Sequence, residues 1–200
     1  MTLDTEYYVL ESENNEHYPL LGIDSESTVG KATFYRPEPV KLEDDDHLVF
    51  AMDAPIPEQP QLSSYLVTPC PVIDEKLKQV LESVMIAGSQ YFPASVRFDG
   101  RLHDHYYFWH VYLEISCLHK ERSEYEWDED DPDFYMVDKI SLDETILNRI
   151  SESGRWVFRL KESINRILVH ESVVEKVMAI NPTGIRFIRV DEWNIGKAFR

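Results

Sequence analysis

The alternation of hydrophobic and polar positions predicts an opening strand and, further along, one amphipathic helix. Residues 7–10 form a short β-prone apolar run, which the polar run 11–16 ends before a helical period develops. In residues 74–87 apolar side chains recur at three- and four-residue spacing, and acidic residues stand where a helix N-terminus favours negative charge. We expect this segment to be a helix that ends at Gly88. Its apolar positions are Leu77, Val80, Leu81, Val84 and Met85.

Residues 106–115 form the densest apolar run, rich in aromatic and β-branched side chains. This composition predicts a central strand that is buried on both faces for much of its length. Residues 90–97 also predict a strand, and Pro93 places it at a sheet edge. Further strands are expected at residues 134–140, 156–160, 166–170 and 185–190, and helices at residues 142–150 and 172–180.

Prolines are concentrated in residues 37–71, which hold seven of the 11 prolines in the chain. Proline lacks a backbone donor, so this stretch is unsuited to helix interiors and central strands. We expect it to wrap the surface, with short edge strands at residues 48–50 and 65–67. The stretch has too many apolar residues for a disordered linker, so no domain boundary is placed there.

These elements predict an α+β fold: a mixed or antiparallel sheet with about three helices packed against it and a proline-rich N-terminal wrap. A chain of 200 residues with 43% hydrophobic content can bury one sizeable core. We therefore expect a single domain over residues 1–200. Within it, residues 1–71 form the strand and wrapping region and residues 72–200 form the α/β core.

Acidic residues outnumber basic ones by 37 to 20, for a formal net charge of −17. This balance opposes binding to nucleic acids or anionic membranes and favours a basic partner. Cys70 and Cys117 lack metal-ligand spacing and are too few for a disulfide framework, which fits a reducing compartment. The N-terminus lacks the features of a signal peptide, and no apolar run approaches the about 18 residues that span a bilayer. We expect a cytoplasmic protein.

The histidines give the clearest candidate metal site. His103, His105 and His110 lie close in sequence, and residues two apart on a strand project to one side. However, His105, His110 and Glu114 do not share strand parity, and Asp99 and Gly100 favour a turn that includes His103 and Asp104. A polar turn followed by ordinary strand histidines is the favoured interpretation, so no metal ligand, cofactor or catalytic residue is assigned. Cys117 and His119 are likewise too close in sequence to supply a nucleophile and its base.

Two acidic runs are candidates for partner binding. Residues 121–133 carry eight acidic residues together with a tyrosine and a tryptophan, and residues 43–46 form a second acidic patch. Tyr and Trp are frequent interface hot spots, whereas solvating loops seldom contain them. The spacing does not follow a calcium-loop pattern. We expect contacts from Tyr125, Trp127, Asp128, Glu129, Asp130 and Asp131, with Asp44, Asp45 and Asp46 as the second patch.

Several strings resemble one bacterial immunity-protein family, the eleventh group of the numbered polymorphic-toxin immunity series, formerly a domain of unknown function. The best match is the C-terminal third, at residues 157–163, 167–169 and 183–190, and residues 7–10, 76–82 and 118–126 agree with it. In the matched strings, Arg159 and Lys161 are expected to pair with nearby carboxylates. Gly184 is expected to supply a backbone conformation that other residues resist.

The resemblance implies a non-enzymatic protein made beside an antibacterial effector, often one delivered by contact-dependent or type VI secretion. Such a protein binds the toxin and protects the producing cell and its kin. No functional residues carry over from the family. Two other functions stay open: a metal-dependent hydrolase built on His103, His105 and His110, and a generic acidic binding module such as a nucleic-acid mimic. Oligomeric state and toxin activity are not encoded in any recognisable motif.

Overall fold

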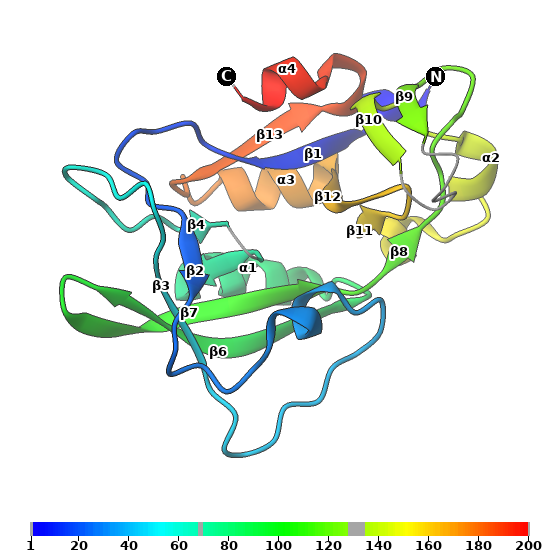
Figure 1. Cartoon of the computed structure of the whole chain (residues 1–200). Coiled ribbons are helices and arrows are strands. Elements are labelled where there is room, and N and C mark those ends of the chain that lie inside the picture. The colour runs from blue at the N-terminus through cyan, green and yellow to red at the C-terminus, as the bar shows by residue number, and fades with distance from the viewer. Residues whose placement is uncertain (1, 68–69, 128–134, 200) are drawn as a thin grey trace.

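The structure, a computed structural model, describes residues 2–67, 70–127 and 135–199 and contains two mixed β-sheets with helices between them (Figure 1). One sheet has five strands and the other has six, and β9 (Glu124–Trp127) and β10 (Tyr135–Lys139) form a separate two-stranded ribbon. The predicted α+β class is confirmed.

The five-stranded sheet joins the first strand of the chain to the last ones. Its strands, in spatial order, are β13 (Ile185–Arg189), β1 (Tyr7–Ser12), β12 (Ser163–His170), β11 (Val157–Leu160) and β8 (Glu114–Ile115). β1 is antiparallel to both neighbours, with Tyr7 opposite His170 and Val9 opposite Ile188. The N-terminal strand therefore lies inside a sheet that is otherwise built mainly from the C-terminal third.

The six-stranded sheet has β7 near its centre, as the sequence predicted. In spatial order its strands are β2 (Leu21–Ile23), β3 (Leu48–Met52), β6 (Ser89–Phe98), β7 (Arg101–Val111), β5 (Val72–Asp74) and β4 (Tyr65–Leu66). β7 pairs with β6 on one side and β5 on the other. Phe108 packs into one cluster and Trp109 into another, so this strand is buried on both faces.

Four α-helices occur in the described residues: α1 (Glu75–Val84), α2 (Glu144–Leu147), α3 (Glu171–Met178) and α4 (Ile195–Ala198). Short 3₁₀ segments are η1 (Leu3–Thr5), η2 (Lys31–Tyr35), η3 (Glu152–Arg155) and η4 (Val190–Glu192). α1 and α3 lie between the two sheets (Figure 1). The Asp74 carboxylate caps α1 by accepting a hydrogen bond from the Leu77 N–H at 2.8 Å.

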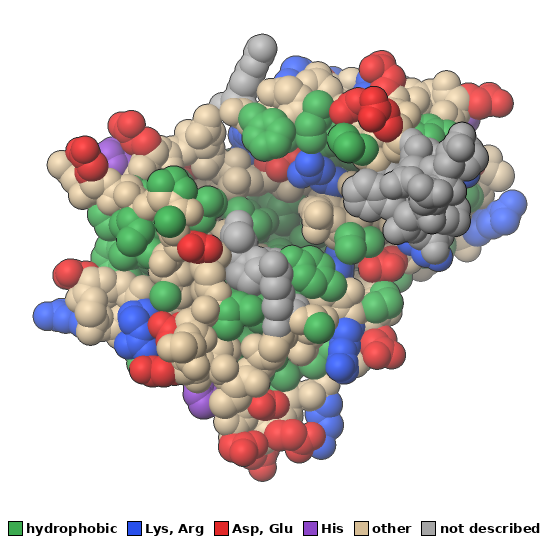
Figure 2. Space-filling view, viewed as in Figure 1, with side chains coloured by type: hydrophobic (Ala, Val, Ile, Leu, Met, Phe, Trp, Pro, Cys, Tyr) green, Lys and Arg blue, Asp and Glu red, His purple; other side chains and the backbone are tan. Residues whose placement is uncertain are grey.

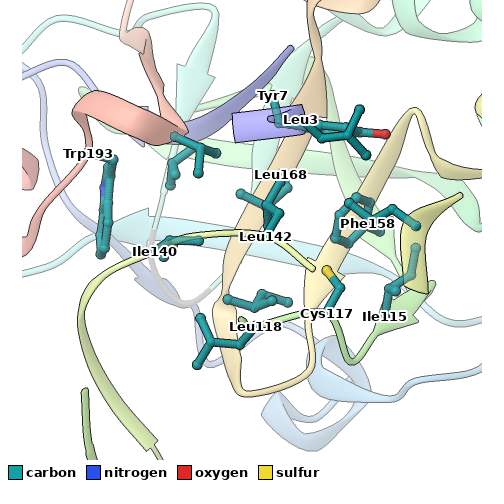
Figure 3. Packing of buried hydrophobic residues seen from close by; sticks show 14 of the residues in the cluster. Leu3, Tyr7, Ile115, Cys117, Leu118, Ile140, Leu142, Phe158, Leu168 and Trp193 are labelled. Atoms are coloured by element: carbon teal, nitrogen blue, oxygen red, sulfur yellow. The ribbon is translucent and has the colours of Figure 1, made fainter. Parts of the chain in front are cut away.

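Three clusters of buried hydrophobic residues fill the layers. The first covers the outer face of the five-stranded sheet and includes Phe158 and Trp193 (Figure 3). The second lies between the sheets, where Leu77 of α1 and Val173 of α3 pack. The third covers the outer face of the six-stranded sheet and includes Phe34 from the N-terminal wrap. Fully burying one such large side chain stabilises the fold by about 1.5–3 kcal/mol.

Two predicted edge strands are interior strands instead. β3 lies between β2 and β6, and β6 lies between β3 and β7. Pro93 is tolerated in β6 because pairing with β3 begins one residue later, at Ala94, so its missing N–H removes no bond from that ladder. The prediction for β4 is consistent with the structure, because in the described residues this strand pairs with β5 alone.

Two local predictions around α1 and β7 were wrong. The helix ends at Val84 and does not continue to Gly88, because Met85 adopts a left-handed conformation with φ of 55°. Met85 is therefore 85% exposed and does not belong to the apolar face. His103 and Asp104 lie within β7, because Asp99 and Gly100, both with positive φ, complete the turn before Arg101.

Candidate partner-binding surface

The β9–β10 ribbon presents an acidic and partly apolar outer face. Tyr125 lies opposite Val137, and both pack toward the first core cluster. Strand alternation then turns the next pair outward: Glu126 and Met136 lie opposite each other, and Met136 is 54% exposed. We name this outward side, together with Glu124, the ribbon face.

Tyr125 anchors the ribbon as well as being a predicted contact. Its side chain is half-buried and packs against the first core cluster. The exposed pair between Lys139 Nζ and Glu124 Oε1, at 3.6 Å, lies on the same ribbon. Exposed pairs of this kind contribute at most about 1 kcal/mol. The ribbon is therefore held by its backbone ladder and by apolar packing more than by this ion pair.

The other predicted residues of the first acidic run are placed only in part. Trp127 belongs to β9 by its backbone and lies opposite Tyr135. Asp128, Glu129, Asp130 and Asp131 fall outside the described residues. The contact role of all these residues stays a prediction.

The second acidic patch lies in the loop between η2 and β3. Asp44 and Asp45 are exposed. Asp46 has a structural role, because its carboxylate accepts hydrogen bonds from Thr28 Oγ1 at 3.0 Å and from the Glu43 N–H at 2.9 Å. This loop and the β9–β10 ribbon lie at opposite ends of the molecule (Figure 1), and acidic side chains gather at the loop end (Figure 2).

Glu124, Glu126 and Met136 were not among the predicted contact residues, and the pairing of β9 with β10 adds them as candidates. Their signal was the alternation of charged and aromatic residues from 124 to 127, which places Tyr125 and Glu126 on opposite sides of a strand. Met136 carried no such signal, because its exposure depends on which strand it pairs with. Pairing across the ribbon brings it beside Glu126.

The structure does not bring the three candidate histidines together. His105 is exposed, with Nδ1 3.9 Å from Glu75 Oε2, and the His103 ring packs on Phe98. His110 is fully buried, with Nε2 3.0 Å from the carbonyl oxygen of Glu38. Among residues 2–67, 70–127 and 135–199, no group of three or more His, Cys, Asp or Glu side chains is arranged to hold a metal ion.

Cys117 is unsuited to nucleophilic chemistry in this fold. Its side chain is fully buried, and burial raises the pKa of its thiol far above the ordinary value. The thiolate is the nucleophilic form, so this environment keeps the residue inert. Cys117 instead packs in the first core cluster beside Leu118 and Ile115 (Figure 3).

Exposed acidic side chains beside an exposed apolar one, as on the ribbon face, are compatible with contact to a basic partner. Comparison with protein-family models identifies the group: residues 6–192 match the immunity protein family (Imm11). The chain belongs to this family, and the match spans nearly its whole length. A comparison with curated proteins finds no match. No helix in the described part of the chain is long and apolar enough to cross a membrane.

Proposed function

We propose that this protein is a cytoplasmic immunity protein that binds a cognate antibacterial toxin and thereby protects the producing cell. The main support for this proposal is the family match over residues 6–192. The match covers strands of both sheets, so it supports a role for the whole fold and not for one segment alone. Inhibition by binding requires no catalytic residue.

The charge of the chain supports a basic toxin surface, such as the active cleft of a nuclease. With a net charge of −17, the protein steers a basic partner toward itself and repels nucleic acid and anionic membranes. Such steering raises the association rate and weakens as salt screens the charges. We propose the ribbon face and the adjoining acidic residues 127–131 as the main contact. The patch at residues 44–46 is the second.

The test is co-expression with the toxic product of a neighbouring gene in a susceptible bacterium, scored by survival and co-purification. Rescue with a stable complex supports the proposal. A toxin that kills despite this chain, and does not bind it, contradicts the proposal for that pair. A neighbour that is not toxic by itself is replaced by the next candidate before scoring.

Mutations then test the ribbon face and the patch at residues 44–46 separately. The double variant Glu126→Gln with Trp127→Ala should weaken toxin binding about tenfold or more, which corresponds to about 1.4 kcal/mol. The double variant Asp44→Asn with Asp45→Asn tests the second patch separately and should weaken binding less, because both side chains are exposed and the structural Asp46 stays intact. Equal affinity of the first variant and the wild type would reject the ribbon face as the main contact.

A second candidate function is a generic acidic binding module, which the net charge of −17 also favours. Such a module would bind many basic proteins with little selectivity. Affinities for several unrelated basic proteins, measured across salt concentrations, separate it from a one-partner inhibitor. A strong preference for the cognate toxin at high salt would exclude the module.

A further inference from the structure

A cavity of about 340 Å³ lies between the two sheets. Its walls come from β1, β11 and β12 of the five-stranded sheet, from the end of β7, from η2 and from the segment that contains β4. Figure 2 shows a recess with hydrophobic side chains near the middle of the face of the molecule that it draws. Ligand sites have volumes of roughly 300–1,000 Å³, so this cavity is of a size for a small molecule.

One wall holds the buried guanidinium of Arg159, which is 5% exposed. Its Nε donates a hydrogen bond to the carbonyl oxygen of Val111, and Nη2 lies 3.5 Å and 3.3 Å from the carbonyl oxygens of Phe34 and Arg36. These bonds connect β11 to the end of β7 and to η2. Arg159 was expected to pair with a nearby carboxylate, but it forms no direct ion pair with the described residues; Glu114, opposite it in the β11–β8 pairing, acts on it only from a distance.

The remaining nitrogen of this guanidinium, Nη1, is not used in the bonds described above. Nη1 makes no hydrogen bond to the described residues, and it is not one of the fully enclosed polar atoms that lack a partner. It therefore keeps accessible surface, and Arg159 lines the cavity. Burial lowers the pKa of Arg159, which reflects the cost of holding its charge away from water. No carboxylate of the described residues contacts this cation, although Glu114, which lies opposite Arg159 in the pairing of β11 with β8, acts on its charge from a greater distance.

The other charged groups in the wall leave one positive charge in excess. Arg166 Nη1 lies 3.2 Å from Glu11 Oε1, and the same oxygen accepts a hydrogen bond from Trp193 Nε1 at 2.8 Å. Glu11 is thus engaged by its own partners. The cavity lining therefore carries two cations and one carboxylate, while Glu114 acts on Arg159 from outside the lining.

The rest of the lining is mainly apolar and aromatic, and it includes Tyr65, Trp109 and Ile167, which are all buried. Such walls favour an apolar ligand body. They disfavour a dianion such as phosphate, which would be desolvated against one cation only. The depth of Arg159 also favours a free small molecule over the end of a partner chain.

We propose that this cavity binds a small monocarboxylic acid with an apolar body, whose carboxylate accepts hydrogen bonds from Nη1 of Arg159 and whose body packs against Trp109 and Tyr65. This binding does not depend on the toxin, because the cavity is lined by residues of this chain alone.

The test is titration of the full chain with phenylacetate, followed by calorimetry and by the NMR signal of the Trp109 indole N–H. We expect saturable binding, and binding of the neutral phenylacetamide should be about tenfold weaker or more, because a hydrogen bond between charged groups is lost. Equal affinity for the acid and the amide would overturn the carboxylate assignment. Absence of binding at millimolar phenylacetate would overturn the proposal.

Two variants locate the site without disturbing Arg159. Ile164 lines the cavity and is 43% exposed, so Ile164→Trp should fill its mouth and abolish phenylacetate binding without unfolding the chain. Ile180→Trp is the matched control, at a residue that is 39% exposed and outside the cavity lining. Unchanged binding by the Ile164 variant would place the ligand elsewhere and refute the proposal.

A last arm distinguishes a free acid from a protein terminus. A short peptide that ends in phenylalanine is tested with a free and with an amidated C-terminus. Binding of phenylacetate, with or without peptide binding, supports the small-molecule site. Binding of the free-terminus peptide alone would show that the cavity captures a chain end and would overturn the small-molecule assignment.

Discussion

Replacing Gly184 with alanine tests how rigidly the two sheets are joined. Gly184 has φ of +78°, and a Cβ atom built on it would lie 2.4 Å from Ser63 Oγ and 2.4 Å from the carbonyl oxygen of Tyr65. A Cβ atom is essentially never found within 3.0 Å of a non-bonded heavy atom, so the two segments must separate. The neighbouring Thr183 holds them together: its carbonyl oxygen accepts from the Tyr65 N–H at 3.1 Å, and its hydroxyl accepts from the Ser64 N–H at 3.0 Å.

The expected loss of stability follows from these contacts. A left-handed conformation costs alanine about 1–2 kcal/mol. Each hydrogen bond broken by the separation contributes about 1 kcal/mol. Alanine also lowers the conformational entropy of the unfolded chain, and this offsets about 0.4–1 kcal/mol of the loss in stability. Gly184→Ala should therefore lower the free energy of unfolding by about 3 kcal/mol.

Gly100→Ala is the matched control. Gly100 has φ of +69°, yet nothing lies within 4 Å of a Cβ built there, so only the conformational cost remains. That cost is largely offset by the unfolded-chain effect, and the net loss should be about 1 kcal/mol or less. Equilibrium urea unfolding of the wild type and both variants measures the difference. If the two alanine variants unfold within about 0.5 kcal/mol of each other, the junction is compliant and this reasoning is refuted.

Two further predictions concern buried polar groups. Tyr7→Phe removes a hydroxyl that donates to the Arg155 carbonyl oxygen at 3.1 Å and accepts from Arg155 Nη1 at 2.6 Å, so urea unfolding should show a loss of about 2 kcal/mol; an unchanged midpoint would show that water replaces the hydroxyl. Burial lowers the pKa of His110, so below about pH 6.5 the unfolded chain binds more protons than the folded one. The free energy of unfolding therefore decreases as the pH is lowered. His110→Gln should therefore flatten the difference in urea midpoint between pH 7 and pH 5, whereas His105→Gln, at an exposed site, should leave it unchanged; equal slopes in both variants would assign the effect to other groups.

Local periodicity was sufficient to predict most of the elements. The helical spacing of Leu77 and Leu81 and the continuous apolar run of β7 are properties of neighbouring residues, and both predictions are confirmed. Sheet order depends on partners far along the chain. Proline content therefore misplaced β3 and β6 at edges, although the contact that decides the matter is the pairing of Leu48 with Ala94.

The candidate surfaces show the same division. The acidic run predicted a charged face, but only the pairing of β9 with β10 shows that Tyr125 points inward and Met136 outward. Arg159 was expected to meet a carboxylate because most arginines do. Its acceptors are carbonyl oxygens of Phe34, Arg36 and Val111, which no pattern around residue 159 can reveal.

The position of β1 between β12 and β13 determines when the five-stranded sheet can form during synthesis. Tyr7 pairs with His170 and Ser12 with Ile185, so β1 has no partner strand until β12 and β13 have been synthesised. Pairings of such long sequence separation form slowly. During synthesis β1 therefore stays unpaired, with both edges exposed, until β12 and β13 have followed it, and the five-stranded sheet cannot form before residue 189 has been made.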